Sequence, residues 1–419
     1  MSDDGAQMTI PELGRRAKAA SRILANASTA SKDAALTAAA DLLIDRTDRI
    51  LAANSIDVAR AELEGVSATV VDRLRLDEKR VASMAAGLRQ VATLPDPVGE
   101  VLDGWVRPNG LRISRVRVPL GVVAIIYENR PNVTSDAAGL CLKSGNAAFL
   151  RGSSGAIDSN IAISSVLREA VASAGLPEDC VVLVSDTSRE AAVEFMRQRE
   201  TVDCLIPRGG PSLIASILEN ATVPFVIDGD GNCHVYVDAD ADLEMALDII
   251  ANAKMQRPSV CNAAETLLVH ASVADQFLPL AAERLSGVEL RADARSMGFL
   301  PGAIAAVDSD WSTEFLDLRL AVAIVDDIDQ AIDHIARNSS GHSEAIITRS
   351  LEAADRFTRE VDAAAVLVNA STRFVDGEEF GFGAEIGIST QKLHARGPMG
   401  LRELTTAKYV VRGDGQIRD

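Results

Sequence analysis

Cys261 lies in a segment whose composition favours a reactive thiol. The run is Lys254-Met-Gln-Arg257-Pro258-Ser-Val-Cys261-Asn-Ala-Ala-Glu265, and it follows a predicted helix that Pro258 ends. A free thiol has a pKa of about 8.5 and is mostly protonated at neutral pH, whereas cations and oriented backbone amides increase its thiolate fraction. With two cationic residues nearby in sequence, Cys261 is a candidate nucleophile.

The other four cysteines have different surroundings. Cys141 and Cys204 lie in apolar segments and Cys180 stands beside a strand start, so all three are predicted to be small core hydrophobes. Cys233 precedes His234 in an alternating strand, which points their side chains to opposite faces. An odd cysteine count without a CxxC pair argues against a disulfide framework and a zinc knuckle.

Two turns suit the binding of phosphate. Arg151-Gly152-Ser153-Ser154 follows a strand-like run and precedes a predicted helix, and Ile206-Pro-Arg208-Gly209-Gly210-Pro211 repeats this layout one crossover later. Basic and hydroxyl groups beside bare amides at a helix N-terminus can hold a phosphate or a phosphorylated ribose. Either turn alone is more often an ordinary loop without a function. Two in one sheet make a phosphate-rich cofactor as plausible as two ordinary loops.

Two familiar motifs are incomplete. Gly229-Asp-Gly231-Asn-Cys-His234 begins like the dinucleotide fingerprint and fails at its last position, and Gly381–Gly387 misses the spacing. Asp238, Asp240 and Asp242 resemble the start of a calcium loop, but the glycine and the bidentate glutamate are missing, so we expect no metal site. A dinucleotide must therefore be held without the usual loop.

The elements that position these residues form an N-terminal helical region and two α/β series. A turn-rich joint at 95–110 leads into the alternating segment 111–118, a plausible arm for pairing with another subunit. Short apolar strands between helices predict parallel sheets covered on both faces, with ligands at the carboxyl ends of the strands. The predicted helices are an early one around 23–27, others at 31–50 with a cap at Ser31, 70–94, 135–143, 158–174, 188–199, 211–219, 240–255, 272–285 and 329–336, and the predicted strands are 122–127, 147–150, 181–185, 203–207, 224–228, 266–269, 320–325 and 345–348.

Composition restricts the class of protein. The 419 residues include 42 basic and 60 acidic side chains, a net charge of −18, with 47% apolar residues. This composition predicts a globular chain of two or three domains and argues against nucleic acid or an anionic membrane as a partner. The start lacks the pattern of a secretory signal, and the most apolar stretch, 118–127, is about half of the roughly 20 residues that a membrane helix needs. We expect a cytoplasmic protein.

Several long motifs of this chain occur in the same order as in a known protein family. It resembles the γ-glutamyl phosphate reductases, an aldehyde-dehydrogenase-type family of proline biosynthesis, from about residue 10 to the C-terminus. The motifs that carry the resemblance are Pro119-Leu-Gly-Val-Val-Ala-Ile-Ile-Tyr-Glu-Asn-Arg-Pro-Asn-Val-Thr134, Leu142-Lys-Ser-Gly-Asn146, 203–210, Gly231-Asn-Cys-His-Val-Tyr-Val-Asp238, 256–270, 335–346 and Gly383-Ala-Glu-Ile-Gly-Ile-Ser-Thr-Gln-Lys-Leu-His-Ala-Arg-Gly-Pro-Met-Gly400.

The resemblance implies an α/β subunit of the aldehyde-dehydrogenase type. Its parts would be a Rossmann-like NADP-binding domain, an α/β catalytic domain and a β arm for homo-oligomerisation with a C-terminal segment. It also explains the incomplete fingerprint, because this superfamily holds NAD(P) without that loop. The implied ranges are 1–105 and 119–232 for NADP binding, 233–380 for catalysis, and 106–118 with 385–419 for the arm and C-terminal segment.

The resemblance also implies roles for individual residues. Cys261 matches the nucleophile, and Asn132 matches the amide that receives the oxyanion together with the backbone N–H of Cys261. Glu314 falls where the wider superfamily grips the nicotinamide ribose, although its Phe-Leu-Asp flank departs from that pattern, and Asn338 is a second departure. The implied NADP(H) contacts are Arg151, Gly152, Ser153 and Ser154 for ribose and phosphate, and Gly209 and Gly210 for the pyrophosphate.

Basic side chains near these motifs are candidates for a polyanionic substrate. Arg130, Lys143 and Arg257 are the substrate-binding candidates, and several cations are expected to converge on the pocket. Histidines at strand or helix ends are more often hydrogen-bonded structure than catalysts. The remaining candidates are Arg208 and Lys254, then Lys392, His394 and Arg396, which are as easily surface or subunit contacts, and the histidines His234, His334 and His342.

The implied reaction is the NADPH-dependent reduction of L-glutamyl 5-phosphate to L-glutamate 5-semialdehyde and phosphate through a cysteine thioester. Direct transfer of the labile acyl phosphate from glutamate 5-kinase is chemically attractive, although no segment indicates a docking site. Two alternatives stay open. One is an enzyme of the same superfamily that oxidises a free aldehyde with NAD(P), and the other is a non-catalytic binding or scaffold protein.

Overall fold

The computed structural model describes residues 8–227 and 229–418, and the chain divides into two compact units. Unit 1 comprises residues 1–227, 382–387 and 399–419, and unit 2 comprises residues 228–381 and 388–398. Each unit is described by itself. Within the described residues, no helix is long and apolar enough to cross a membrane.

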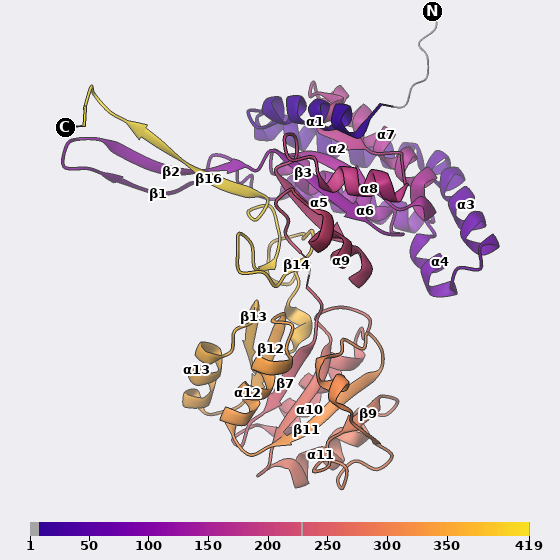
Figure 1. Ribbon diagram of the computed structural model, residues 1–419, viewed down its shortest axis with the longest axis vertical. Helices are drawn as coiled ribbons and strands as arrows, with labels where there is room; N and C mark the ends of the chain where they lie inside the picture. Colours follow the sequence, from indigo (N-terminus) through magenta and orange to yellow (C-terminus); the bar gives the residue numbers. More distant parts are fainter. Residues whose placement is uncertain (1–7, 228, 419) are drawn as a thin grey trace, which may run out of the picture. The chain divides into compact units, whose positions relative to one another are not determined.

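Unit 1 is built on a four-stranded parallel sheet in the order β5-β4-β3-β6. Alternate residues of β3 (Val122–Tyr127) pack with α1, α8 and α9 on one face, and α6 and α7 lie against the sheet as well (Figure 1). The apolar strands predicted at 122–127, 147–150, 181–185 and 203–207 are confirmed. The remaining elements are α1 (Ile10–Leu24), α2 (Thr29–Asp45), α3 (Thr47–Leu63), α4 (Ala68–Leu74), α5 (Glu78–Thr93), α6 (Asn132–Lys143), β4 (Ala147–Arg151), η1 (Ser154–Ala156), α7 (Ile157–Ser173), η2 (Glu178–Cys180), β5 (Val181–Leu183), α8 (Arg189–Met196), β6 (Cys204–Arg208) and α9 (Pro211–Asn220).

Local polar contacts set helix boundaries that periodicity alone placed wrongly. The Oγ of Ser28 accepts a hydrogen bond from the backbone N–H of Ser31 at 3.1 Å, so Ser28 is the cap that the sequence analysis had assigned to Ser31. The segment 31–50 is interrupted at Arg46, where the backbone leaves helical geometry. The segment 70–94 likewise splits into α4 and α5, because Asp77 is extended and its side chain caps α5.

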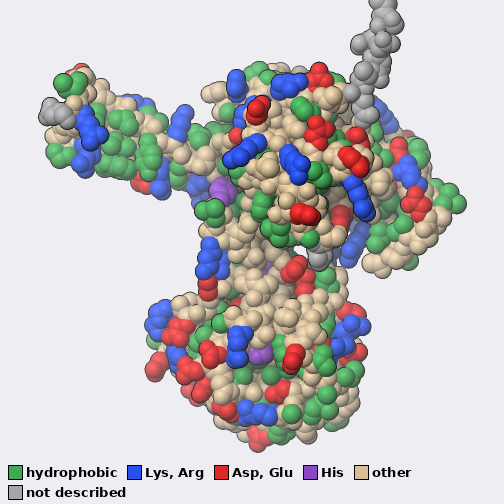
Figure 2. Space-filling view, viewed as in Figure 1, with side chains coloured by type: hydrophobic (Ala, Val, Ile, Leu, Met, Phe, Trp, Pro, Cys, Tyr) green, Lys and Arg blue, Asp and Glu red, His purple; other side chains and the backbone are tan. Residues whose placement is uncertain are grey.

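An antiparallel sheet of β1 (Val101–Val106), β2 (Arg112–Pro119) and β16 (Thr405–Arg412) forms an arm of unit 1 (Figure 1). The strand predicted at 111–118 is confirmed, but β1 was missed because it lies in the Gly- and Pro-rich joint. Gly104 allows the close pairing, since a Cβ there would lie 3.1 Å from the carbonyl oxygen of Ile113. Figure 2 shows hydrophobic side chains gathered along the arm among scattered Lys and Arg.

Unit 2 contains a seven-stranded parallel sheet in the order β10-β9-β11-β8-β7-β12-β13. Helices α10 and α11 cover one face, and α12 and α13 cover the other. The elements are β7 (Cys233–Val237), α10 (Leu243–Met255), β8 (Ala264–His270), α11 (Ala274–Arg284), β9 (Glu289–Ala292), β10 (Ile304–Ala305), η3 (Asp308–Ser312), β11 (Arg319–Val325), α12 (Ile328–Asn338), β12 (Ser343–Ile347), α13 (Leu351–Glu360), β13 (Ala365–Val368), η4 (Thr372–Phe374), β14 (Ile388–Ser389) and β15 (Gly397–Pro398).

The strand predicted at 224–228 is wrong. The described part of this segment makes only an isolated bridge between Leu205 and Phe225. The carbonyl oxygen of Pro224 accepts from Leu205 at 2.8 Å, but proline has no N–H to continue a ladder. Residue 228, the end of the predicted strand, lies outside the described residues. Strands β9, β10 and β13 and helix α13 were not predicted.

Candidate active site

Cys261 lies in the loop between α10 and β8 and is partly exposed, whereas the other four cysteines are buried. Burial raises the pKa of Cys180 and of Cys204 to about 12, and it raises the pKa of Cys141 and Cys233 above the usual range. These four thiols therefore stay protonated near neutral pH. The prediction that Cys141, Cys180 and Cys204 are core residues is confirmed, and Cys261 is the thiol with access to solvent.

The start of β7 supports the backbone of the Cys261 loop. A Cβ on Gly231 would lie 1.6 Å from the carbonyl oxygen of Cys261 and 2.6 Å from its Cα, so only glycine fits there. The Sγ of Cys233 lies 3.2 Å from the same carbonyl oxygen and 3.8 Å from Nδ1 of His342. These contacts of Gly231 and Cys233 fix the backbone of the Cys261 loop.

Glu314 belongs to this neighbourhood. Its Oε1 accepts a hydrogen bond from the backbone N–H of Gly231 at 2.8 Å. Because Gly231 touches Cys261, the carboxylate lies near the nucleophile loop within unit 2. Asn232, the next residue, donates from Nδ2 to the carbonyl oxygens of Trp311 and Asn338 at 2.8 and 2.7 Å, so Asn338 contributes through its backbone here.

Lys254 is a structural residue rather than an exposed cation. It is fully buried, and its Nζ lies 2.5 Å from Oε2 of Glu265, which joins the end of α10 to the start of β8. The other carboxylate oxygen accepts from the backbone N–H of Leu316 at 3.2 Å. Burial lowers the pKa of Lys254 and raises that of Glu265, while the charge of each partner opposes the shift of the other. The ion pair therefore links the two elements that precede and follow the Cys261 loop.

Arg373 is a residue that the sequence analysis missed. Its Nε donates to Oε1 of Gln256 at 2.8 Å, and Asn262, which follows the nucleophile, donates from Nδ2 to the carbonyl oxygen of Val375 at 2.9 Å. Burial and the charge of Arg257 lower the pKa of Arg373, and the charge of Cys261 is among the influences that raise it. The signal that could have found Arg373 is its position just after β13, at the carboxyl end of a parallel strand.

The candidate groups of unit 1 at the end of β3 differ in exposure. Asn132 is the first residue of α6 and is exposed, and its Nδ2 donates to Oδ2 of Asp136 at 2.8 Å. Arg130 is also exposed. Lys143 is buried instead, and its Nζ contacts Oδ1 of Asp33 at 2.5 Å and the carbonyl oxygen of Ala92 at 2.8 Å. The expectation that Lys143 binds substrate is therefore corrected: it ties α6 to α2 and α5.

The turn after β4 forms a tightly packed cradle. Arg151 is only 7% exposed, and its Nη2 donates to the carbonyl oxygen of Ser188 at 2.7 Å. Burial lowers the pKa of Arg151. A Cβ on Gly152 would lie 2.0 Å from Nδ2 of Asn160. The Oγ of Ser153 bonds Oδ1 of Asn129, while Ser154 accepts from Arg60 at its backbone carbonyl oxygen at 3.1 Å.

Two buried donors of this cradle lack a hydrogen-bond acceptor among the described residues. They are Nε of Arg151 and Nδ2 of Asn160. Buried polar groups are normally satisfied, so orphaned donors beside a phosphate-type turn fit an anionic or polar ligand. The turn also precedes the helical residues η1 and α7. Its composition and its two orphaned donors suit a phosphorylated ribose.

The second turn follows β6, the strand next to β3. A Cβ on Gly209 would lie 2.7 Å from Leu213 and 2.8 Å from the Glu128 carboxyl carbon, whereas a Cβ on Gly210 would meet nothing within 4 Å. The backbone N–H of Gly210 donates to Oε2 of Glu128 at 3.3 Å. Helix α9 begins directly afterwards. Gly209 is thus required by packing, and Gly210 leaves open space at the start of a helix.

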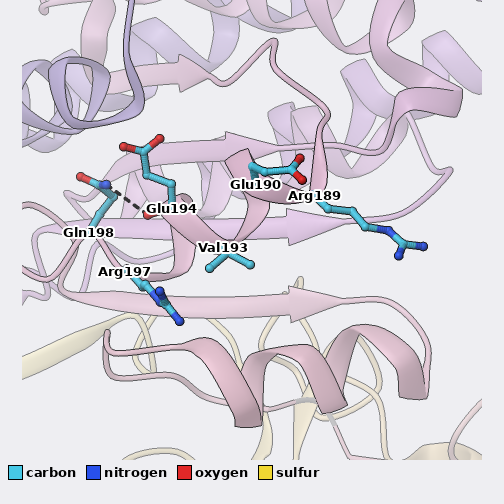
Figure 3. Close-up of a pocket in the computed structure, with 6 residues that line it drawn as sticks. All are labelled: Arg189, Glu190, Val193, Glu194, Arg197 and Gln198. Carbon is cyan, nitrogen blue, oxygen red and sulfur yellow. Dashed lines mark hydrogen bonds between the residues drawn. The ribbon is translucent and has the colours of Figure 1, made fainter.

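A pocket of about 530 Å³ lies along α8 and is lined by side chains of that helix and of the two residues that follow it (Figure 3). The Nε of Arg197 donates to the carbonyl oxygen of Asn220 at 3.2 Å, which joins the ends of α8 and α9. Ser188, the partner of Arg151, caps the same helix. The lining residues are Arg189, Glu190, Val193, Glu194, Arg197 and Gln198.

The remaining sequence candidates have structural partners. Lys392 and Arg396 both pair with Asp362, the latter at 2.7 Å, and His394 is exposed. Burial lowers the pKa of His334 and of His342 to about 4, so both are neutral at physiological pH. His234 is fully buried with its Nδ1 3.0 Å from Oε2 of Glu344. Interpreting these histidines as structural residues agrees with this geometry.

Comparison with known proteins agrees with the fold and the motifs. Residues 3–303 match the model of the aldehyde dehydrogenase family. The γ-glutamyl phosphate reductase of Caldanaerobacter subterraneus is 55% identical over 413 residues, which cover 98% of this chain and 100% of that protein. The same enzyme of Carboxydothermus hydrogenoformans is 58% identical over 408 residues, with 97% and 98% covered.

Solved structures give the same result. The crystal structure of γ-glutamyl phosphate reductase from Thermotoga maritima matches with a TM-score of 0.97 and 50% identity, covering 98% of this chain and 100% of that one. An acetylating aldehyde dehydrogenase from Geobacillus thermoglucosidasius, 18% identical, matches with a TM-score of 0.67 over 98% of this chain and 97% of that one, which shows a shared fold. The α/β aldehyde-dehydrogenase fold expected from the sequence is confirmed.

Proposed function

Since this chain belongs to the aldehyde dehydrogenase family, and within it to the γ-glutamyl phosphate reductases, we propose that it reduces L-glutamyl 5-phosphate to L-glutamate 5-semialdehyde and phosphate with NADPH. This is the second step of proline biosynthesis from glutamate. The observation that carries the proposal is the partly exposed thiol of Cys261, in a loop that packs closely against Gly231 and accepts a hydrogen bond from Arg373 at Gln256.

The first half of the reaction forms a thioester. The Cys261 thiolate attacks the acyl carbon of the substrate, the S–C bond forms, and the C–O bond to phosphate breaks with its electron pair leaving on the phosphate. The amide of Asn132 and the backbone N–H of Cys261 stabilise the tetrahedral oxyanion. One such donor contributes roughly 3–4 kcal/mol of transition-state stabilisation.

The coenzyme is proposed to lie in the unit 1 cradle. When bound, NADPH supplies the hydride that converts the thioester into aldehyde and free thiolate. Arg151 and the serines after it hold the phosphorylated ribose, and the donors left unpaired on Arg151 and Asn160 support this assignment. Gly209 and Gly210 let the backbone approach the pyrophosphate, and Glu314 orients the nicotinamide ribose. A 2′-phosphate needs a cationic partner, which favours NADPH over NADH.

Water is a competitor in this reaction, because hydrolysis of the thioester would waste the intermediate. An aldehyde oxidiser of the same family needs a general base to activate water. His342 is buried and His334 is partly buried, and both have lowered pKa values and protein neighbours, so neither supports that role. The 55% identity to a γ-glutamyl phosphate reductase supports reduction over the alternative of free-aldehyde oxidation.

The proposal extends to organisation and partners. Residues 1–105 and 119–232 would bind NADP, 233–380 would carry the chemistry, and 106–118 with 385–419 would join subunits of a cytoplasmic homo-oligomer. Exposed apolar side chains on the arm support the last assignment: Trp105 and Tyr409 are both exposed and pack edge to face, with ring centroids 6.3 Å apart. A transient contact with glutamate 5-kinase would protect the labile acyl phosphate.

The reverse reaction tests the proposed function. Purified enzyme is incubated with L-glutamate 5-semialdehyde and NADP⁺, with and without phosphate, and NADPH is followed by absorbance. Strict dependence on phosphate is expected, because phosphate must cleave the thioester. Equal NADPH production without phosphate would favour the aldehyde oxidiser, and no production in either case would favour the scaffold. Repeating the assay with NAD⁺ tests the coenzyme preference.

A further inference from the structure

We propose that Arg373, together with Arg257, forms the subsite that binds the phosphoryl group of the acyl-phosphate substrate. This inference rests on the proposed function and deepens it, because it assigns one part of the substrate to named residues. Arg373 lies in η4, more than 100 residues after Cys261 in sequence.

The side chain of Asn262 joins the nucleophile loop to the η4 loop. Asn262, buried and next to Cys261, donates from Nδ2 to the carbonyl oxygen of Val375 at 2.9 Å and lies 3.5 Å from that of Arg373. Ser371 caps η4 by accepting from the backbone N–H of Arg373 at 3.3 Å. These contacts fix the backbone of Arg373 beside the residue that follows the nucleophile.

The side chain of Arg373 is held by neutral groups. Its Nε donates to Gln256 at 2.8 Å, and Gln256 precedes Arg257 in sequence. Neither Arg257 nor Arg373 forms an ion pair with a carboxylate in the part of the chain that the structure describes. Because Arg373 bonds to the residue directly before Arg257, the two arginines are neighbours, and in agreement with this the charge of Arg257 lowers the pKa of Arg373. Two close cations without an anion are unfavourable, and an oxyanion between them would relieve the repulsion.

The carboxyl groups near this pair only partly offset its charge. Asp376 and Glu379 raise the pKa of Arg373, but burial and Arg257 outweigh them. Glu379 is exposed, and Asp376 accepts from the backbone N–H of Glu378 at 2.9 Å. Neither of these carboxyl groups pairs directly with Arg373 in the described part of the chain, so its guanidinium is available to an anion in a protein whose total charge is −18. A local cationic site is what a polyanionic substrate requires in such a chain.

The chemistry of the substrate selects the phosphoryl group over the α-carboxylate. The phosphate is bonded to the carbon that Cys261 attacks, whereas the α-carboxylate is separated from that carbon by a chain of three further carbons. The contacts of Asn262 place the η4 loop beside the residue that follows Cys261, which puts Arg373 in the neighbourhood of the attacked carbon. Guanidinium groups bind phosphate with paired N–H donors, and they stabilise the negative charge that leaves with it.

The test uses the reverse reaction, in which phosphate is a substrate. Arg373→Gln should raise the KM for phosphate by about 10- to 100-fold, the range expected for losing hydrogen bonds to a charged group. The KM for semialdehyde should stay nearly constant. Arg373→Lys should recover part of the phosphate affinity. Arg295→Gln is the matched control, because Arg295 pairs with Asp326 by a hydrogen bond of 2.6 Å remote in sequence from the nucleophile loop.

A second readout is independent of turnover. Inorganic phosphate should slow alkylation of Cys261 by iodoacetamide in the wild type, and Arg373→Gln should abolish this protection. An unchanged phosphate KM, or a raised KM for semialdehyde alone, would overturn the subsite and assign Arg373 to the carboxylate or to structure. If wild-type protein shows no phosphate-dependent turnover, the proposed function fails, and protection by phosphate still decides whether the subsite exists.

Discussion

Arg151 in unit 1 and Arg373 in unit 2 have different surroundings. In unit 1, Arg151 is buried, donates to the carbonyl oxygen of Ser188, and borders a turn in which Gly152 packs against Asn160. In unit 2, Arg373 is partly exposed and is held by the amide of Gln256 next to a second guanidinium. The first site is a closely packed turn in which two buried donors lack an acceptor among the described residues. In the second, no carboxylate of the described residues forms an ion pair with Arg373.

The two units also differ in their histidine content. All five histidines of the chain fall within unit 2, and unit 1 contains none. A coenzyme that is bound through its phosphates and ribose needs a complementary pocket with fixed hydrogen-bond donors, and pH changes such a pocket little. A site that stabilises a thiolate and a departing phosphate needs charged groups close to one another, so that each group influences the pKa of the others. The following experiments test whether the two units are separable in this way.

Replacing Cys261 should have the largest effect. Cys261→Ser is expected to reduce turnover by at least about 10⁴-fold, because a serine hydroxyl is a much weaker nucleophile near neutral pH. NADPH binding, measured by fluorescence titration, should be retained if the cradle of unit 1 works independently. The matched control is Cys180→Ser, a buried cysteine of unit 1. Wild-type turnover in Cys261→Ser would remove the thiol from the mechanism.

Asn132→Ala tests the contribution of unit 1 to the chemical step. Loss of one oxyanion donor should lower kcat by about 10²- to 10³-fold with little change in KM. Steady-state kinetics in the forward direction provide the measurement, and Asn109→Ala, in the turn of the arm, is the control. A change of less than threefold in kcat would mean that Asn132 only caps the local structure through Asp136.

Acid should destabilise the histidine-bearing unit. The pKa of His342 in the folded chain is about 4, below its ordinary value, so the unfolded chain binds a proton first as pH falls. Its contribution is therefore full above about pH 6.5 and is lost toward about pH 4, by up to about 3 kcal/mol. Urea unfolding at pH 7.5 and 5.0 should show a smaller difference for His342→Asn than for wild type. His394→Asn, at an exposed position, is the control, and an unchanged difference for His342→Asn would contradict the prediction.

Gly210→Ala should have the smallest effect. The φ of Gly210 is −79°, and an added Cβ meets nothing within 4 Å, so the protein alone tolerates alanine. A coenzyme pyrophosphate against this backbone would not, and we expect the KM for NADPH to rise about tenfold at constant Tm. Gly298→Ala, equally free of contacts, is the matched control. An unchanged KM would remove Gly210 from the coenzyme site.

The parts of the fold that were predictable from the sequence are those determined by local pattern. The buried strands β3 to β6 are continuous apolar runs between helices, so their type and order follow from the residues. Helix α5 begins at a single capping carboxylate, that of Asp77. The spacing of apolar residues does not reveal such a cap, so the break between α4 and α5 was not predicted. Strand β1 forms because it pairs with β2. The Gly-rich sequence of β1 does not by itself predict a strand.

The candidate site divides in the same manner. The motif around Cys261 was recognisable because its residues are adjacent in sequence. Lys143 was misassigned because its partner Asp33 lies 110 residues upstream, a contact that sequence proximity to a motif cannot indicate. Arg373 and the close approach of Gly231 were missed for the same reason, since both depend on the order of strands in the sheet of unit 2.

The most direct test of the sulfur's role is mass spectrometry of the trapped enzyme. Wild-type protein is mixed with semialdehyde and NADP⁺ in phosphate-free buffer, quenched in acid and digested. We expect a glutamyl adduct on the peptide that contains Cys261, and we expect it to be absent when phosphate is added before the quench. An adduct on any other residue, or sustained phosphate-dependent turnover while Cys261 remains unmodified, would contradict it.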